Sequence, residues 1–540
     1  MGEPTLSGLM MDEYPLSLTA VVERAELLTP ERKVVYRRPD CNVHRTTMGD
    51  CVRRARRLAA ALAELGIKEG DRMGTLMWNQ PEHLEAYYGV PAMGAVVHTL
   101  NPRLHPDELA FIAADAEDRA IIVDETLVGV LDSFRGAHDF EHVIVVSHSG
   151  KVPDGVIDYE SLIDRGQPME WPAPDERRAC AICYTSGTTG RPKGVLYSHR
   201  ALVLHSFMAC MPDQMNMSMC DTVLPVVPMF HANAWGIPYT ATMVGASLVL
   251  PGPHLDAESV LDLLAEEKVT LTAGVPTVWM AMLKAIEAEP DRWDLGNLHR
   301  LLVGGSAVPR SMIEGYQKHG LFIIQGWGMT ETSPLASTSS VPPELAGAPD
   351  EEKFDYRARQ GTPAPFVDIR ARGDDGELIP WDDKAMGELE VRGPWVAGAY
   401  FGGTGAEKFT GDGWFQTGDV VKINQHGCIR ITDRSKDLVK SGGEWISSVD
   451  MENLLMGHPA VAEAAVIAVP DEKWDERPMA VVVLKDGAEA TLDDLREHLS
   501  SHFAKWQLPE RVEFIDEIPR TATGKFKKIA LREQFVKAPV

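Results

Sequence analysis

The chain has 540 residues, of which 44% are hydrophobic and 24% are charged. This length and composition exclude a disordered protein and indicate several folded domains with large apolar cores. With 79 Asp and Glu against 53 Lys and Arg, the formal charge is −26. That charge excludes general nucleic-acid binding and attachment to anionic membrane surfaces, because both need dense positive charge.

The N-terminal third predicts alternating helices and strands. Residues 47–65 carry apolar side chains at helical spacing with arginines on the opposite face, which predicts an amphipathic helix. Short apolar runs at 73–77, 120–123 and 142–146 are separated by further helical patterns. This alternation is typical of a parallel α/β sheet, and the same rhythm resumes after residue 180.

Two features bear on cellular location. The acidic N-terminus lacks a basic region followed by an apolar one, so we expect no signal peptide and a cytoplasmic protein. Between Asp221 and Asp256 there is no Asp, Glu, Lys or Arg, which could also indicate a membrane span. Five prolines, together with His231 and Asn233, interrupt this run and would leave backbone groups unpaired in lipid. We therefore expect a buried strand, loop and helix.

A glycine-rich loop follows the apolar strand at 180–184. Glycines allow a tight turn whose N–H groups converge, hydroxyls add donors, and a lysine adds a point charge, so the segment predicts a polyphosphate cradle. It is not the usual P-loop sequence, because Pro192 and Gly194 flank the lysine. The strand contains Cys180 and Cys183, but no second pair accompanies them, which favours half-buried strand positions over a metal site. The residues of the cradle are Thr185, Ser186, Gly187, Thr188, Thr189, Gly190 and Lys193.

From 361 to 432 the pattern changes to short alternating segments separated by turn residues, which predicts antiparallel β-structure with a hairpin at 425–427. Residues 433–437 then precede a helix at 448–456, strands at 463–469 and 479–484, and a helix at 491–503. We place the main domain boundary at 433–437, before this compact α+β unit.

The glycine-rich loop resembles the signature of acyl-adenylate-forming enzymes, which include acyl-CoA synthetases, peptide-synthetase adenylation domains and luciferases. Four more segments in the same order resemble other motifs of that family and extend the resemblance over 184–528. They are the adenine and magnesium motif at 326–331, the ribose motif at 417–419, the hinge at 433–437 and the catalytic-lysine motif at 519–525.

The resemblance implies an α/β fold in three parts. Residues 1–433 are expected to form a large N-terminal domain of two doubly wound sheets plus a small β-barrel. Residues 434–436 are the expected hinge, and Lys436 matches the hinge position of the family. Residues 437–540 are expected to form a small, mobile α+β lid, which rotates between the two steps of the reaction.

The resemblance also implies how ATP, Mg²⁺ and the acid are held. Lys525 is expected to bridge the carboxylate and the α-phosphate, Thr330 to hold the α-phosphate, and Glu331 to ligate Mg²⁺, which prefers oxygen ligands. Asp419 is expected to bind the ribose hydroxyls, assisted by Arg434. The other residues expected to bind ATP or AMP are Gly305, Ser306, Ala307, Gln325, Gly326, Trp327 and Gly328.

Two further sites are implied by the same resemblance. His231, Trp235 and Gly304 are expected at the acyl substrate, with Trp235 gating an apolar tunnel, although core packing of Trp235 and His231 remains an alternative. The expected coenzyme A residues, which an exposed turn would also explain, are Lys440, Ser441, Gly442, Gly443, Glu444 and Trp445.

Similarity to bacterial medium- and long-chain fatty acyl-CoA synthetases extends over 225–231, 273–279 and 440–448. It predicts an AMP-forming acid–thiol ligase and, by resemblance to the long-chain branch, a homodimer that exchanges N-terminal segments. A 3-methylmercaptopropionate–CoA ligase is the nearest alternative, and a non-catalytic acyl or nucleotide sensor is the alternative of another class. ATP, coenzyme A and the acid are all anions, whereas the protein has a formal charge of −26. Local cations would allow it to bind them, since residues 520–537 include six basic residues and one acidic residue.

Overall fold

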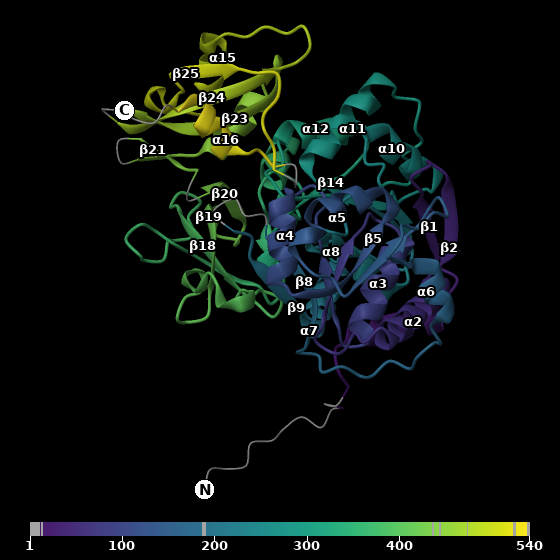
Figure 1. Ribbon diagram of the computed structural model, residues 1–540. Coiled ribbons are helices and arrows are strands. Elements are labelled where there is room, and N and C mark those ends of the chain that lie inside the picture. The colour runs from purple at the N-terminus through teal and green to yellow at the C-terminus, as the bar shows by residue number, and fades with distance from the viewer. Residues whose placement is uncertain are drawn as a thin grey trace.

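The computed structural model describes residues 11, 14–185, 191–434, 437–441, 444–471, 474–521 and 525–536. Four β-sheets and their covering helices account for most of this part of the chain. Figure 1 shows the first half of the chain, in purple to teal, on one side, with the green and yellow C-terminal sheets beside and above it. The predicted α/β class is confirmed by this arrangement.

The first large sheet has seven strands in the order β7-β6-β5-β3-β4-β8-β9. All neighbouring strands are parallel except β8 and β9, whose antiparallel pairing brings both ends of the glycine-rich segment together. The strands are β3 (Arg72–Leu76), β4 (Val96–Thr99), β5 (Asp118–Asp124), β6 (His142–Val146), β7 (Ile157–Asp158), β8 (Ala179–Tyr184) and β9 (Gly194–Ser198).

The second large sheet has nine strands in the order β16-β15-β14-β13-β12-β10-β11-β1-β2, with a parallel centre from β14 to β1. It holds β1 (Lys33–Arg37), β2 (Val43–Thr47), β10 (Thr222–Pro225), β11 (Ser247–Leu250), β12 (Leu271–Gly274), β13 (Arg300–Val303), β14 (Ile323–Gly328), β15 (Leu335–Thr338) and β16 (Thr362–Pro363).

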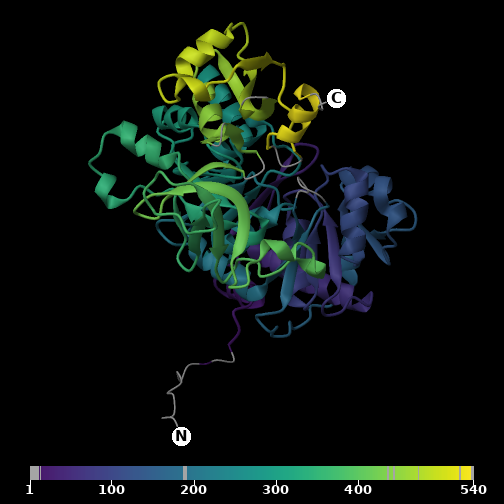
Figure 2. The ribbon, with the colours of Figure 1, turned by 90° about the vertical axis from the view of Figure 1, so that its left-hand side faces the viewer.

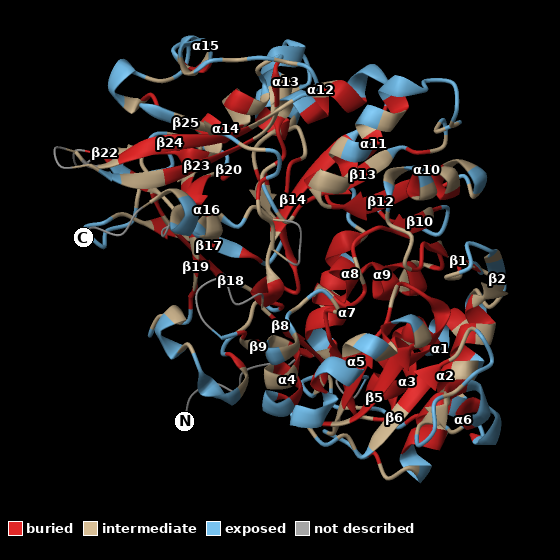
Figure 3. Cartoon of the chain, turned by 45° about the horizontal axis from the view of Figure 1, so that its top comes forward, coloured by how far each residue is buried: buried red, intermediate tan, exposed pale blue. Residues whose placement is uncertain are grey.

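Helices cover these two sheets, and those between the sheets are buried on most sides (Figure 3). All twelve residues of α3 are buried, because its neighbours include both α2 and the strands of the first sheet. The helices up to residue 357 are α1 (Leu18–Leu28), α2 (Met48–Glu64), α3 (Pro81–Ala92), α4 (Pro106–Asp115), α5 (Val128–Phe134), α6 (Tyr159–Arg165), α7 (His199–Ala209), α8 (Ala232–Trp235), α9 (Ile237–Val244), α10 (Ala257–Glu266), α11 (Pro276–Ala288), α12 (Arg310–Lys318) and α13 (Asp350–Arg357).

The region predicted to form a small barrel is a four-stranded antiparallel sheet in the order β17-β18-β19-β20. In its hydrogen bonding it is an open sheet with β17 and β20 at its edges, and the predicted hairpin at 425–427 joins β19 to β20. The strands are β17 (Asp368–Arg372), β18 (Gly387–Arg392), β19 (Phe415–Ile423) and β20 (Ile429–Arg434).

The C-terminal part forms a fourth sheet, with the order β22-β21-β24-β23 and β25 paired to β24. Figures 1 and 2 both place it at the end of the molecule opposite the N-terminus. The predicted helix at 448–456 is confirmed. The elements are β21 (Val439–Ser441), β22 (Glu444–Ile446), α14 (Ser448–Met456), β23 (Val461–Asp471), β24 (Asp475–Leu484), α15 (Leu492–Leu499), β25 (Arg511–Phe514) and α16 (Lys528–Phe535).

The uncharged run at 222–255 is built into the core as β10, α8, α9 and β11, most of whose residues are buried. In the part of the chain that the structure describes, no helix is both long and apolar enough to cross a membrane. Cys180 and Cys183 are buried free thiols on β8, so the prediction of strand positions is confirmed.

Candidate active site

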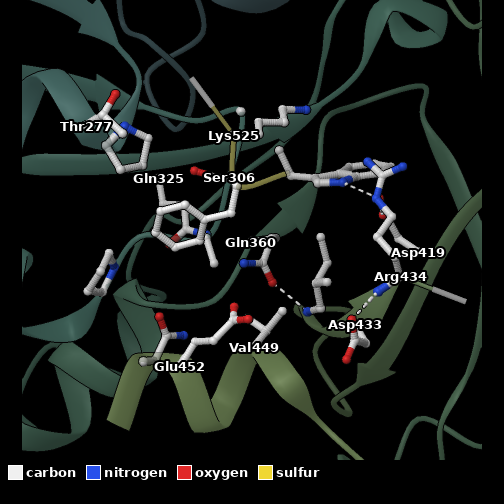
Figure 4. A pocket seen from close by; sticks show the side chains of 18 of the residues that line it. Thr277, Ser306, Gln325, Gln360, Asp419, Asp433, Arg434, Val449, Glu452 and Lys525 are labelled. Atoms are coloured by element: carbon white, nitrogen blue, oxygen red, sulfur yellow. Dashed lines mark hydrogen bonds and ion pairs between the residues drawn. The ribbon is translucent and has the colours of Figure 1, made fainter. Parts of the chain in front are cut away.

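A cavity of about 210 Å³ lies where the nine-stranded sheet, the four-stranded sheet and the C-terminal unit meet (Figure 4). Its walls include the loop after β13, the end of β14, strands β19 and β20, helix α14 and the segment before α16. Ten of the residues predicted to bind ATP or AMP, or to act in catalysis, line it together: Gly305, Ser306, Ala307, Gln325, Gly326, Trp327, Gly328, Asp419, Arg434 and Lys525.

The Gly-Trp-Gly segment at the end of β14 has a steric explanation. A Cβ atom on Gly328 would lie 1.8 Å from the carbonyl oxygen of Pro334, and one on Gly326 would lie 2.8 Å from Leu335 Cδ1. The pairing of β14 with β15 also shifts register between Trp327 and Gly328. Only glycine permits this close approach, which directs the Trp327 ring into the cavity wall.

Asp419 is the central carboxylate of the cavity. Its side chain is buried; one oxygen accepts a hydrogen bond from Trp327 Nε1 at 3.0 Å, and the other lies 2.7 Å from Arg434 Nε. The register of β19 against β20 places Asp419 opposite Arg434, and Figure 4 shows both on one side of the cavity. Each carboxylate oxygen has a second lone pair, so Asp419 retains the capacity to accept from two hydroxyls.

Gln325 supplies a polar atom without a partner. Its side-chain oxygen is buried and accepts no hydrogen bond from any residue that the structure describes, although Gln325 lines the cavity. A buried acceptor of this kind is costly unless a ligand satisfies it. An amino group, such as that of adenine, has the matching chemistry.

Lys525 extends into the cavity from the segment before α16 and is half-buried. Burial lowers the pKa of its ammonium to about 8, and the Arg434 guanidinium adds to this effect, while Asp419 and Glu331 oppose it. In Figure 4 its side chain lies across the cavity from Val449 and Glu452 of α14. The C-terminal unit therefore contributes a cation to a site formed mainly by the preceding sheets.

Glu331 lies in a short 3-10 turn (Thr330–Thr332) directly after β14. The side chain is 5% exposed, and one of its oxygens accepts a hydrogen bond from the Tyr400 hydroxyl at 2.6 Å. Thr330 is held through its carbonyl by the Tyr197 hydroxyl at 2.7 Å. The negative charge of Glu331 acts on both Lys525 and Arg434, so the structure brings the predicted magnesium ligand into the same site.

The two ends of the glycine-rich segment are fixed to each other. Thr185 N–H donates to the Lys193 carbonyl at 3.0 Å, and Lys193 N–H donates to Thr185 Oγ1 at 3.2 Å. The Lys193 ammonium lies 4.9 Å from the centre of the Tyr400 ring. The predictions for Ser186, Gly187, Thr188, Thr189, Gly190, Lys436, Gly442 and Gly443 concern residues outside the described part of the chain.

The predicted acyl-site segment has an unusual backbone. Four consecutive residues have positive φ angles: Ala232 (42°), Asn233 (54°), Ala234 (48°) and Trp235 (56°). This left-handed turn costs about 1–2 kcal/mol for each non-glycine residue. Such strain occurs where the surroundings hold it in place. One such contact is the hydrogen bond from Cys183 Sγ to Asn233 Oδ1 at 3.0 Å.

The turn places Trp235 against Gly304. A Cβ atom on Gly304 would lie 3.3 Å from Trp235 Cη2 and 2.7 Å from the Gly326 carbonyl oxygen. His231 precedes the turn, and burial lowers its pKa to about 4, with a further contribution from the Lys525 ammonium. The imidazole is therefore neutral at pH 7. Gly304 thus adjoins Gly326 of the nucleotide cavity, and Trp235 packs on the side of Gly304.

Of the predicted coenzyme A residues that the structure describes, none lines this cavity. Lys440 and Trp445 line a separate space between β17–β19 and β21–β22, which contains four carboxylates. Lys440 Nζ lies 3.4 Å from Asp374 Oδ2, and Ser441 is buried and accepts a hydrogen bond from Arg477. Glu444 begins β22. In this arrangement the site around Lys525 and the predicted coenzyme A residues face different spaces.

The structure also reveals contacts that the sequence did not indicate. Tyr400 contacts both Glu331 and Lys193, which are 138 residues apart (331 − 193). Gln360 lines the cavity and accepts from Ile431 N–H at 2.6 Å. Neither lies in a recognisable motif, and a lone tyrosine or glutamine has no signature in sequence. Only the fold shows that they belong to the site.

Comparisons with known proteins agree with this geometry. The family model "AMP-binding enzyme" matches residues 22–401, and the model "AMP-binding enzyme C-terminal domain" matches residues 450–525. A long-chain-fatty-acid–CoA ligase of Thermus thermophilus is 49% identical over 97% of this chain and 96% of its own length. A 3-methylmercaptopropionyl-CoA ligase of Ruegeria lacuscaerulensis is 42% identical over 98% of both chains, and a medium-chain-fatty-acid–CoA ligase of Ectopseudomonas oleovorans is 42% identical over 98% and 97%.

Solved structures show the same fold. The crystal structure of an anthranilate CoA ligase in complex with anthranoyl-AMP superposes with a TM-score of 0.85, at 25% identity over 98% of this chain and 99% of that chain. The fold and the shared cavity define the adenylate-forming class of enzymes. The CoA ligases of this class use ATP, Mg²⁺ and coenzyme A. The chain belongs to the AMP-binding enzyme family and is an acid–thiol ligase.

Gly304→Ala is expected to push Trp235 and the Gly326 carbonyl away from residue 304, because the new methyl group has no room between them. Overpacking of this kind costs about 1–3 kcal/mol, so we expect kcat/KM for the acid to fall about 10-fold or more. Gly347→Ala is the matched control, since its Cβ would meet nothing within 4 Å. Equal kinetics for the two variants would contradict the assignment of Gly304 to the acyl site.

Tyr400→Phe is expected to release Glu331 from its hydrogen bond while preserving the ring beneath Lys193. A hydrogen bond to a charged group contributes about 1.5–3 kcal/mol, so the KM for MgATP should rise about 10-fold. Tyr14→Phe, at a side chain 70% exposed, serves as control. An unchanged dependence on Mg²⁺ and ATP would show that Tyr400 does not position Glu331.

Proposed function

We propose that this enzyme is an AMP-forming acyl-CoA synthetase that acts on medium- or long-chain fatty acids. An acid and ATP form acyl-AMP and pyrophosphate, and coenzyme A then displaces AMP to form the acyl-CoA. The observation that carries the proposal is the single cavity in which Lys525 meets Asp419, Arg434 and the Gly305–Ala307 segment. Such a site can hold a nucleotide and neutralise its α-phosphate.

Adenylation joins two anions, so it needs charge stabilisation more than proton transfer. Lys525 is proposed to bridge the acid's carboxylate and the α-phosphate, with Thr330 also on that phosphate. Asp419, oriented by Trp327 and Arg434, is proposed to accept the ribose hydroxyls. The buried oxygen of Gln325 is proposed to accept from the adenine amino group.

Glu331 is the proposed protein ligand of Mg²⁺. It fits because it offers a carboxylate oxygen, and Mg²⁺ is commonly bound by one or two carboxylates together with substrate phosphates and water. When bound, the ion neutralises phosphate charge and favours departure of pyrophosphate. The glycine-rich segment from Thr185 to Lys193 is proposed to hold the β- and γ-phosphates.

The acid is proposed to enter beside the left-handed turn. Trp235, Gly304 and the buried uncharged segment at 222–255 form an apolar neighbourhood next to the nucleotide cavity. Relatives of comparable identity are named for long-chain, medium-chain and 3-methylmercaptopropionyl substrates. A pocket distinguishes one methylene by only about 1–3 kcal/mol, so 3-methylmercaptopropionate is the second candidate acid.

The coenzyme A step is proposed to use another arrangement of the C-terminal unit. Lys440 and Trp445 face a separate space in the present arrangement, so they would need to move to reach acyl-AMP. A domain boundary with residues 1–433 before a hinge at 434–436 and a lid at 437–540 would permit that movement, which would also withdraw Lys525. The remaining proposed coenzyme A residues lie in the same segment.

Three further statements complete the proposal. A non-catalytic sensor is disfavoured because binding alone does not require both Glu331 and Lys525. We propose a cytoplasmic location, in keeping with the sequence, and a homodimer, by resemblance to long-chain ligases. The partners are small molecules, namely the acid, ATP and coenzyme A.

A panel of carboxylic acids from C2 to C18, including 3-methylmercaptopropionate, tests the function. We expect ATP-dependent release of pyrophosphate without coenzyme A, and acyl-CoA formation after it is added, with the highest kcat/KM among medium- or long-chain acids. Absence of pyrophosphate release with every acid would refute the ligase, and a maximum at 3-methylmercaptopropionate would select the second candidate. Sedimentation of the same preparation measures its oligomeric state.

Lys525→Ala is expected to slow adenylation by about 100-fold or more, since it removes the cation at the developing charge, while thioester formation from supplied acyl-AMP persists. Lys527→Ala, at an exposed neighbour, should leave both steps intact. Equal losses in both half-reactions of Lys525→Ala would contradict the role of Lys525 in adenylation.

The pH dependence of the wild-type enzyme gives a second prediction. With the pKa of Lys525 at about 8, the protonated form is present below that pH, so kcat/KM for adenylation should fall as pH rises through 8.

A further inference from the structure

A second lysine, which the proposed mechanism does not use, is buried three residues after Lys525. Lys528 is the first residue of α16, and its side chain is only 10% exposed. Its ammonium lies 2.7 Å from Glu452 Oε1 and donates to Ser448 Oγ at 2.5 Å. Both partners lie on α14, one turn apart. A lysine is rarely buried unless it is paired.

The cluster extends across the predicted hinge. Asp433, on β20, is 1% exposed and accepts a hydrogen bond from Ser448 N–H at 2.9 Å, so it binds the N-terminus of α14. Four residues after Lys528, Arg532 forms an ion pair with Asp437 at 2.8 Å. The cations of α16 therefore pair with carboxylates that follow residues 434–436, and the bond from Ser448 N–H to Asp433 joins this group to the strand that precedes them.

The charges in this cluster depend on one another. Burial raises the pKa of Asp433 and of Glu452, and the Lys528 ammonium opposes both shifts. Burial disfavours the charge on Lys528, yet Glu452 and Asp433 hold its pKa above the ordinary value. Without Lys528, two buried carboxylates would lose their shared cation, which is costly in a low-dielectric interior.

The same lysine is mechanically close to Lys525. Two residues separate them in the chain, so their Cα atoms are at most about 11 Å apart. The strand-like segment that bears Lys525 is fixed by Thr521 N–H to the Lys525 carbonyl at 2.7 Å and by Lys527 N–H to the Pro519 carbonyl at 2.7 Å. Anchoring Lys528 on α14 therefore limits where the backbone of Lys525 can lie.

We propose that Lys528, held by Glu452 and by Ser448, whose N–H also donates to Asp433, is a positioning residue that seats Lys525 over the nucleotide cavity for the adenylation step. Because Asp433 precedes the hinge whereas the other three residues follow it, the cluster also fastens the C-terminal unit in this arrangement. This inference rests on the proposed function, since it assigns Lys528 to one half-reaction.

The test compares Lys528→Met with Lys528→Arg, using Lys527→Met as the control. We expect Lys528→Met to lower acid-dependent ATP–pyrophosphate exchange at least about 10-fold, because Lys525 loses its anchor, while thioester formation from supplied acyl-AMP stays within about 2-fold of wild type. Lys528→Arg retains a cation and should recover most of the exchange. Lys527→Met should match wild type in both assays.

A second measurement does not depend on activity. Trypsin can cleave after Arg434, Lys436 and Lys440, and we expect cleavage there to be at least about 5-fold faster in Lys528→Met than in wild type or Lys527→Met. If Lys528→Met does not fold, Ser448→Ala serves as the second variant, because it removes one hydrogen bond to the Lys528 ammonium. We expect Ser448→Ala to lower ATP–pyrophosphate exchange more than thioester formation, by a smaller factor than Lys528→Met. Equal losses in both half-reactions, or unchanged exchange and cleavage, would overturn the proposal. If the wild-type enzyme is inactive with every acid but Lys528→Met still increases cleavage by trypsin, the proposed ligase function is refuted. The role of Lys528 in fastening the C-terminal unit is then retained.

Discussion

The ion pair between Asp419 and Arg434 connects the parts of the candidate site. Its carboxylate orients Trp327 at the end of β14, and its guanidinium belongs to the last residue of β20, which is also the first residue of the predicted hinge. The same guanidinium lowers the pKa of Lys525, which comes from the C-terminal unit. One buried pair thus links the nine-stranded sheet, the four-stranded sheet and the lysine. The register of two antiparallel strands determines this pair, so the site depends on correct pairing of β19 with β20.

The proposed reaction brings several anions together on a protein with a formal charge of −26. The structure resolves this conflict by local placement of cations. Lys525 and Arg434 line the cavity, and Lys193 lies beside Tyr400, which in turn contacts Glu331. Burial strengthens these interactions, because the effective dielectric constant is lower than in water. With a pKa of about 8, Lys525 can also lose its proton or move back into solvent at low cost. Both suit its proposed role in only one of the two steps.

Much of the fold and of the cavity could be predicted from sequence. The α/β alternation, the antiparallel region, the hairpin at 425–427 and the helix at 448–456 all follow from periodicity and turn residues. Ten of the residues that line the cavity could be predicted because each lies in or beside a local motif. By contrast, Tyr400 and Lys528 contact residues that are distant in the sequence. Tyr400 contacts Glu331, 69 positions away (400 − 331), and Lys528 contacts Glu452, 76 positions away (528 − 452). No local pattern encodes such contacts, and Lys528 resembles the exposed Lys527 beside it in sequence.

The class of fold, the order of the motifs and the chemistry of each motif could all be predicted from the amino-acid sequence. These properties depend on neighbouring residues and on local conformation. The tertiary structure alone decided which motifs share a cavity, since their distances depend on strand order and register. It also decided that four residues at 232–235 adopt a strained left-handed turn and that a buried lysine cluster spans the hinge. These features exist only because distant segments compress, pair and desolvate one another.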